Sequence, residues 1–234
     1  MGERPLAGRR IVVTRPRDQA TALAAGLLEL GASVTVLPLI AIEPFDEATG
    51  IADGTYDWVV FTSANAVAAV GAPRGSRVAT VGPATAEAVR TLGLEPAFVP
   101  ERFAAEEIAA GLEPLAGVRV LLPQADIADP GLAEELRRRG ATVDAVTTYR
   151  TVEVERTSEE LAGLRAADAV VLTSGSAARS LARQGGAGNA LVVCIGPKTE
   201  AVAREAGLEV GLVARETTAE GIIHALTTHF GENQ

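Results

Sequence analysis

Short apolar runs alternate, along most of the chain, with longer segments whose apolar residues recur at helical spacing. The two clearest runs are V-V-F at 59–61 and V-V-L at 170–172. Runs like these, without a polar residue, are typical of strands buried on both faces of a parallel sheet. Strands that alternate with short helices predict right-handed βαβ crossovers, so we expect an α/β fold with parallel sheets.

The same pattern places the individual elements. Strands are expected near residues 9–13, 32–37, 57–61, 77–81, 97–99, 118–122, 142–148, 168–172, 191–195 and 210–213. Helices are expected near 18–30, 64–70, 85–92, 104–110, 130–139, 176–183, 199–206 and in a last segment ending near Phe230. T-S-E-E at 157–160 and T-T-A-E at 217–220 match the capping box, in which Ser or Thr and a Glu three residues later satisfy N–H groups at a helix start. They predict two further helix starts.

The chain contains an internal repeat of about 110 residues. D-W-V-V-F-T-S-A-N-A at 57–66 resembles D-A-V-V-L-T-S-G-S-A at 168–177, and V-G-P at 81–83 resembles I-G-P at 195–197. Separately, R-R-I-V-V at 9–13 resembles V-R-V-L-L at 118–122. Two units of similar plan are therefore expected.

The order of the repeated pieces allows two domain arrangements. A tandem duplication would give contiguous domains at 1–110 and 117–225. Alternatively, residues 43–147 form one continuous domain, and 1–37 joins 152–234 in a discontinuous one, with crossings near 38–43 and 148–154. We favour the second arrangement because both crossings, I-A-I-E-P and Y-R-T-V-E-V, are extended and similar, which suits a two-stranded connector. A binding cleft would then lie between the domains.

Hydroxyl residues and Gly-Pro pairs follow several predicted strands, and they are the candidate binding residues. Ser and Thr at a helix start satisfy free N–H groups, and the partial positive charge of a helix N-terminus favours anions. The candidates are Arg15, Ser63, Asn65, Gly82, Thr85, Ser174, Ser176, Gly196, Thr199 and Thr218. The alternative for the Ser and Thr residues is a purely structural capping role, and Arg15 could equally be a solvated loop residue.

Composition limits the function further. The chain has 21 Lys and Arg against 30 Asp and Glu, a net charge of −9, which argues against non-specific binding to nucleic acid or anionic membranes. Its one cysteine, Cys194, excludes an internal disulfide and a two-cysteine catalytic pair. No apolar run approaches the length of a membrane span, so we expect a cytoplasmic protein. Few apolar side chains lie on the outer faces of the predicted helices, so we expect a monomer.

Motifs for common cofactors are missing from the sequence. No G-x-G-x-x-G follows a predicted strand and no G-x-x-x-x-G-K-[ST] occurs, which disfavours dinucleotide and nucleoside-triphosphate enzymes. The two histidines, His224 and His229, lie near the C-terminus and leave little to build a metal site from. We therefore expect a small-molecule substrate and no cofactor.

Several short motifs occur in a characteristic order. They are G-R-R-I-V-V-T-R-P at 8–16, W-V-V-F-T-S-A-N-A-V at 58–67, V-A-T-V-G-P-A-T-A at 78–86, Y-R-T at 149–151, V-L-T-S-G-S-A at 171–177 and I-G-P-K-T at 195–199. Their order and spacing resemble the uroporphyrinogen-III synthase family. The resemblance implies two flavodoxin-like, doubly wound parallel-sheet domains joined by a two-stranded connector. It also implies a cofactor-free lyase of tetrapyrrole (heme) synthesis, which closes linear hydroxymethylbilane to uroporphyrinogen III with loss of water and inversion of ring D.

Tyr149 is the candidate proton donor for this chemistry, because it follows a predicted strand and matches the position where the family carries a tyrosine. A phenol with a pKa near 10 is a weak acid at neutral pH, so we expect conformational control of the substrate to contribute most. The implied substrate carries eight carboxylates while the protein is acidic, so local donors must bind it. Two alternatives remain open: a two-domain small-molecule sensor without catalysis, and a flavodoxin-like electron carrier, for which flanking aromatic residues are scarce.

Overall fold

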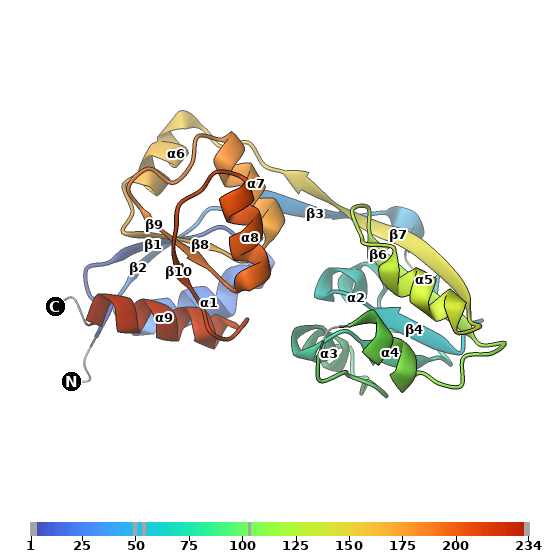
Figure 1. Cartoon of the computed structure of the whole chain (residues 1–234). Coiled ribbons are helices and arrows are strands. Elements are labelled where there is room, and N and C mark those ends of the chain that lie inside the picture. Colours follow the sequence, from blue (N-terminus) through green and yellow to red (C-terminus); the bar gives the residue numbers. More distant parts are fainter. Residues whose placement is uncertain (1–3, 49–50, 53–54, 103, 232–234) are drawn as a thin grey trace. The chain divides into compact units, whose positions relative to one another are not determined.

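The computed structural model describes residues 4–48, 51–52, 55–102 and 104–231 (Figure 1). The chain divides into two compact units, unit 1 consisting of Met1–Ala41 with Val152–Gln234 and unit 2 of Ile42–Thr151. Both units are α/β. No helix in the described ranges is long and apolar enough to cross a membrane.

Unit 1 contains a five-stranded sheet in the order β10-β9-β8-β1-β2, with every pair parallel. Its strands are β1 (Arg10–Val13), β2 (Ser33–Val36), β8 (Ala169–Leu172), β9 (Leu191–Cys194) and β10 (Val210–Val213). Its helices are α1 (Arg17–Glu29), α6 (Ser158–Arg165), α7 (Gly175–Arg183), α8 (Pro197–Glu205) and α9 (Ala219–Gly231). Counted from β2, the strand order is 2-1-3-4-5, which is the flavodoxin-like order with its reversal between β1 and β8.

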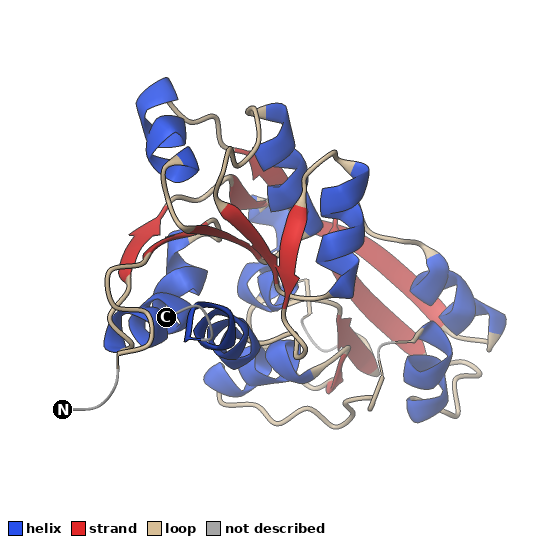
Figure 2. Ribbon diagram, turned by 60° about the vertical axis from the view of Figure 1, so that its left-hand side comes forward, coloured by secondary structure: helices blue, strands red, loops and turns tan. Residues whose placement is uncertain are grey.

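The two faces of this sheet bury alternate residues of each strand. In β8, Val170 and Leu172 pack in one cluster with residues of α7 and α8, whereas Ala169 and Val171 pack in a second cluster with residues of α1 and α9. Helices accordingly lie on both sides of the strands of unit 1 in Figures 1 and 2. This double burial explains the unbroken apolar run at 170–172.

Unit 2 contains a sheet in the order β3-β7-β6-β4-β5. Its strands are β3 (Ile40–Pro44), β4 (Trp58–Phe61), β5 (Arg77–Thr80), β6 (Arg119–Ala125) and β7 (Thr142–Glu153). Its helices are α2 (Ala64–Val70), α3 (Pro83–Thr91), α4 (Ala105–Gly111) and α5 (Gly131–Arg138), with a 3-10 turn η1 (Asp46–Ala48). The strands β4 to β7 pair in parallel, and their order β7-β6-β4-β5 repeats that of β2-β1-β8-β9 although the chain enters at a different strand.

The predicted α/β class is confirmed, and the sheet of unit 2 corrects one detail because it is mixed rather than wholly parallel. The backbone N–H of Phe45 donates to the carbonyl of Thr148 at 3.0 Å, and that of Val154 donates to the carbonyl of Leu39 at 3.0 Å. Rising residue numbers on one side thus meet falling numbers on the other, so β3 is antiparallel to β7. Both crossings of the chain between the units fall within this strand pair, after Ala41 and after Thr151.

Several boundaries differ from those expected. The segment 97–99 forms a single bridge, Ala79 with Phe98, because the prolines at 96 and 100 lack the N–H groups that a longer ladder requires. Helices α3 and α8 begin at Pro83 and Pro197, two residues early, since Pro is favoured at the first helical position. The capping box at Thr157 is confirmed, whereas α9 is capped by Thr218, whose Oγ1 accepts from the Gly221 N–H at 3.0 Å.

The repeated aspartates join strands at the N-terminal edges of the two sheets. Asp168 Oδ2 accepts from the Arg10 N–H at 2.7 Å, and Asp57 Oδ2 accepts from the Arg119 N–H at 2.8 Å. The N–H of each aspartate donates in return to the carbonyl of the same arginine, at 2.8 and 2.9 Å. These two aspartates therefore help to fix the register between neighbouring strands. They lie at the edge of each sheet opposite the candidate site.

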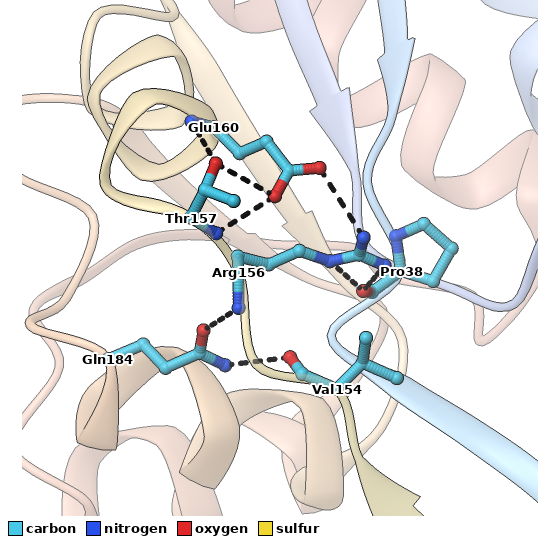
Figure 3. A network of polar contacts seen from close by, with 6 residues as sticks. All are labelled: Pro38, Val154, Arg156, Thr157, Glu160 and Gln184. Carbon is cyan, nitrogen blue, oxygen red and sulfur yellow. Dashed lines mark hydrogen bonds and ion pairs between the residues drawn. The ribbon is translucent and has the colours of Figure 1, made fainter.

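A polar network holds the chain where it leaves and re-enters unit 1 (Figure 3). The Arg156 guanidinium donates to the Pro38 carbonyl through Nε at 2.8 Å and also through Nη2. The Gln184 amide accepts from the Arg156 N–H at 2.8 Å and donates to the Val154 carbonyl at 3.1 Å and to Ser180 Oγ at 2.8 Å. The side chains of Arg156 and Gln184 thereby satisfy the Pro38 and Val154 carbonyls and the Arg156 N–H, which would otherwise lack partners.

Candidate functional site

The carboxyl ends of the strands at each reversal of strand order form the candidate site, since open α/β sheets bind ligands at this position. In unit 1, the buried Thr14 hydroxyl at the end of β1 donates to the Val171 carbonyl of β8 at 2.8 Å. In unit 2, the Thr62 hydroxyl at the end of β4 donates to the Pro123 carbonyl of β6 at 3.4 Å. Each bond joins the two strands between which the order reverses.

Tyr149 and Ser63 meet at this edge of unit 2. The Tyr149 hydroxyl lies 2.8 Å from Ser63 Oγ, and either atom could be the donor. Ser63 Oγ also accepts from the Ala66 N–H at 3.1 Å as the N-cap of α2. The tyrosine side chain thus reaches from β7 past β6 to the end of β4, which fixes the phenol in one orientation.

The surroundings of Tyr149 hold its ring in place. Only 5% of the residue is exposed, and the ring packs in an apolar cluster that includes Phe61, Val67 and Leu121. The Ser63 hydroxyl is the polar side-chain group that contacts the phenol oxygen. The geometry therefore pairs two hydroxyl groups, either of which can donate to the other or to a ligand.

Unit 1 repeats the cap without the tyrosine. Ser174 Oγ accepts from the Ala177 N–H at 3.2 Å as the N-cap of α7, but the repeat places Ile40 where unit 2 has Tyr149. Among the described residues, the Ser174 hydroxyl accepts this one bond and donates none. Its proton is thus available to a ligand.

Arg15 follows Thr14 at the end of β1 and is half-buried. Burial lowers the pKa of its guanidinium, and the charge of Asp18 opposes this effect. No hydrogen bond or ion pair joins this guanidinium to another residue in the described part of the chain. A partly desolvated cation without a partner is suited to bind an anion.

The remaining candidates take several positions. Gly82 and Gly196 are the N-caps of α3 and α8 in extended backbone, while Thr85 and Thr199, two residues into these helices, are only 5% and 6% exposed. A Cβ on Gly196 would lie 2.8 Å from Thr217 Oγ1, so the loop after β10 closely approaches the N-terminus of α8. Asn65 and Ser176 are half-buried on the first turns of α2 and α7.

The candidates divide between the two units. Unit 1 carries Arg15, Ser174, Ser176, Gly196, Thr199 and Thr218, and unit 2 carries Ser63, Asn65, Gly82, Thr85 and Tyr149. Two of the candidates, Ser63 and Tyr149, are hydrogen-bonded to each other through their side chains. No three His, Cys, Asp or Glu side chains lie close enough to hold a metal ion within the described ranges.

One residue near the pair went unnoticed in the sequence. Ile127 is 66% exposed in the loop after β6, and the N–H of the preceding residue, Asp126, donates to the Tyr149 carbonyl at 3.2 Å. The available signal was a large apolar residue between two aspartates in the segment A-D-I-A-D-P at 125–130. A hollow of about 550 Å³ lies elsewhere, between β10 and α9, and its lining includes His224 and His229.

Comparison with known proteins gives a consistent family. The sequence model described as "Uroporphyrinogen-III synthase HemD" matches residues 21–224. The uroporphyrinogen-III synthase of Synechococcus elongatus is 28% identical, over 97% of this chain and 97% of the relative. The chloroplastic enzyme of Oryza sativa is 30% identical, over 94% of this chain and 81% of the relative.

A solved structure supports the fold. The uroporphyrinogen-III synthetase of Helicobacter pylori superposes with a TM-score of 0.66 at 16% identity, over 94% of this chain and 99% of that chain. At this identity the likeness concerns the fold alone.

Proposed function

The chain belongs to the uroporphyrinogen-III synthase family, and we propose that Tyr149 and Ser63 are the residues with which it carries out the proton transfers of that reaction. Members of the family close linear hydroxymethylbilane to uroporphyrinogen III with loss of water and inversion of ring D. The observation that carries the proposal is the 2.8 Å contact between the two hydroxyl oxygens at the carboxyl edge of sheet strands β4 and β7.

In the first step, the Tyr149 O–H donates its proton to the hydroxyl of the substrate's hydroxymethyl group. The C–O bond then breaks, water leaves, and an azafulvene cation forms at the substrate. The phenolate left on Tyr149 accepts the hydrogen bond of Ser63, which remains held by the Ala66 N–H. The cation attacks the substituted α-carbon of ring D, and the bond from that carbon to the methylene bridge of ring C then breaks, which inverts ring D and leaves a second azafulvene cation on ring C. This cation closes the macrocycle on the unsubstituted α-carbon of ring D. That carbon loses its proton to the phenolate, so the enzyme returns to its starting state.

Carboxylate binding is assigned to helix N-termini and to Arg15. Helices α3, α7, α8 and α9 begin at the carboxyl edges of the sheets, where their N–H groups and partial positive charge favour anions. Each contact contributes roughly 0.3–1 kcal/mol when exposed, so many must act together. The Ser174 hydroxyl can donate a further bond, and Arg15 can add a bidentate one.

The apolar pyrrole rings need a different contact, and Ile127 is the residue that we assign to it. Its side chain is exposed, and the residue before it, Asp126, donates its N–H to the Tyr149 carbonyl. Holding a flexible chain in one folded-back conformation is an entropic contribution, and it is the larger part of the catalysis that this proposal requires.

The finer expectations on cellular context belong to the same proposal. The chain is acidic and its one cysteine is buried. We propose that it works in the cytoplasm as a monomer and acts on a small-molecule substrate. We also propose that it uses no cofactor and binds neither nucleic acid nor a membrane. Size-exclusion chromatography with light scattering would test the monomer.

The experiment that tests the function is a coupled assay in which hydroxymethylbilane is generated in the presence of this protein. The oxidised products are then separated into isomers I and III. Isomer III in excess over the spontaneously formed isomer I is the expected result. Isomer I alone, from folded protein, would remove the enzyme and leave a ligand sensor as the explanation of the fold.

A further inference from the structure

Four arginines of unit 1 lie on segments that follow the carboxyl ends of its strands, and none of the four has a hydrogen-bond or ion-pair partner for its side chain among the described residues. Besides Arg15, they are Arg17 at the start of α1, Arg179 in the second turn of α7 and Arg215 in the loop after β10. The side chains of Arg17, Arg179 and Arg215 are exposed, and no hydrogen bond or ion pair within the described ranges uses them. We call these four residues the basic rim.

Most other guanidinium groups of the chain are engaged. Arg9 and Arg10 contact Asp168, and Arg156, Arg165 and Arg183 bond to backbone or acidic groups within unit 1. The partner-free state of the basic rim is therefore not typical of the arginines of this protein.

The position of Arg17 is electrostatically unfavourable for the helix itself. It is the first residue of α1, where the helix carries partial positive charge and where acidic side chains are preferred. A cation at this position destabilises the helix slightly and adds to the positive potential of the edge. Departures from local rules without a structural gain are expected where a protein binds a ligand.

The two units also differ in net charge, and unit 1, which carries the basic rim, is the less acidic one. Unit 1 has 12 Arg and Lys against 14 Asp and Glu, a net charge of −2, whereas unit 2 has 9 against 16, a net charge of −7. The acidity of the chain is thus concentrated in the unit that carries Tyr149. Acidic residues near the basic rim reduce its potential without forming ion pairs with its arginines; they are Asp18 near Arg15, and Glu216 and Glu220, which line one hollow together with Arg215.

Among the described residues, the corresponding edge of unit 2 has no arginine without a partner. Its arginines there, Arg102 and Arg150, are engaged with Glu107 and Glu43 at 3.7 and 2.7 Å. The hydroxyl groups of Tyr149 and Ser63 lie at this edge instead. The repeated units have therefore acquired different side-chain chemistry at equivalent edges.

We propose that the basic rim of unit 1 binds carboxylates of the substrate. Arg17, Arg179 and Arg215 are the binding residues that this adds to Arg15. The rim follows the strands from β1 to β10, which lie three strand spacings apart, roughly 14 Å. That span suits a ligand whose carboxylates are distributed over four rings. The inference rests on the proposed function, because it takes the substrate from the family.

The test compares Arg17→Gln, Arg179→Gln, Arg215→Gln and the triple variant with Arg74→Gln. Arg74 is a matched control because it is also exposed and free of side-chain partners in the described ranges, but it lies in unit 2 between α2 and β5. The measurements are kcat and KM for hydroxymethylbilane at low and high salt. Binding of uroporphyrin III, a fluorescent octacarboxylate, is titrated in parallel.

Each single variant is expected to raise KM and the Kd for uroporphyrin III about two- to fivefold, and the triple variant tenfold or more, with kcat nearly unchanged. The salt dependence of KM should weaken in the triple variant, and Arg74→Gln should match the wild type. A triple variant indistinguishable from Arg74→Gln would overturn the inference while leaving the synthase intact. Absence of isomer III from the wild type would instead refute the proposed function, and the titration would still report on the rim.

Discussion

Thr80 and Cys194 occupy equivalent positions in the two repeated units. Each is the last residue of its strand, β5 or β9, each is fully buried, and each precedes a Gly-Pro pair by two residues. The Thr80 hydroxyl has no hydrogen-bond partner among the described residues. The equivalent thiol of Cys194 needs none, because a thiol is a weak donor that behaves as a small apolar group.

Replacing Thr80 by Val should stabilise the protein, because it removes a buried hydroxyl that has lost its water without gaining a partner. We expect a gain of about 1 kcal/mol in the free energy of unfolding. Thr14→Val is the matched control, since the buried Thr14 hydroxyl donates to the Val171 carbonyl at 2.8 Å, and it should cost about 1 kcal/mol. Urea unfolding measures both, and a loss of stability in Thr80→Val would contradict the prediction.

Cys194 should make the protein less stable at alkaline pH. Burial raises the pKa of its thiol from 9.0 to about 11, with the charge of Glu200 adding to the effect. Between these values the unfolded chain loses a proton that the folded chain keeps, so stability falls as pH rises through this window. Urea midpoints of wild type and Cys194→Val from pH 8 to 10.5 should diverge above pH 9. Parallel curves would show that the thiol does not contribute.

Tyr149→Phe should lower kcat roughly ten- to a thousandfold, as expected for loss of a general acid, while KM changes little. The other tyrosine of the chain, Tyr56, provides the control because it lies before β4 at the opposite edge of the sheet. Tyr56→Phe should retain the wild-type rate in the coupled assay. A Tyr149→Phe rate within twofold of wild type would exclude the phenol as proton donor.

Ser63→Ala and Ser174→Ala separate the capping role from the chemical one. Both remove an N-cap hydroxyl, so both should lower stability by about 1 kcal/mol. Ser63→Ala alone removes the partner of the Tyr149 hydroxyl. It should lower kcat roughly 10- to 100-fold, given about 1.5–3 kcal/mol for a hydrogen bond to a charged group. Ser174→Ala should act on KM instead, and equal loss of kcat in both variants would refute this assignment.

Gln184→Leu should loosen the backbone at the point where the chain re-enters unit 1. The change removes the partners of the Arg156 N–H and the Val154 carbonyl, at a cost of about 1–3 kcal/mol. Hydrogen exchange should show lost protection of the Arg156 amide, while Gln184→Glu, which keeps an acceptor, should preserve it. Unchanged protection in Gln184→Leu would mean that the network is not needed there.

The sequence alone predicted the elements that depend on local patterns. The apolar runs 59–61 and 170–172 lie in β4 and β8, and the capping box at Thr157 forms. The segment 97–99 was overestimated because its apolar residues outweighed the flanking prolines in the prediction. The strand β7 was underestimated because its last residues are polar and are held by pairing with β3, which is distant in sequence.

Side-chain relationships at the site were beyond reach of the sequence. Ser63 and Tyr149 are 86 residues apart, and their contact depends on the order of β4, β6 and β7 in the sheet. The half-burial of Arg15 and the free hydroxyl of Thr80 likewise depend on neighbours from other elements. Local spacing identified Tyr149 and Ser63 as separate candidates, and only the three-dimensional arrangement relates them.

The Val154 N–H donates to the Leu39 carbonyl at 3.0 Å. The point where the chain leaves unit 1 and the point where it returns therefore lie side by side. A turn of a few residues could therefore join them and bypass the whole of unit 2. The chain is in this sense a complete flavodoxin-like domain that carries a permuted relative of itself as an insertion. Its history can be understood as one gene copied into the interior of another copy, with the antiparallel strand pair marking the two junctions.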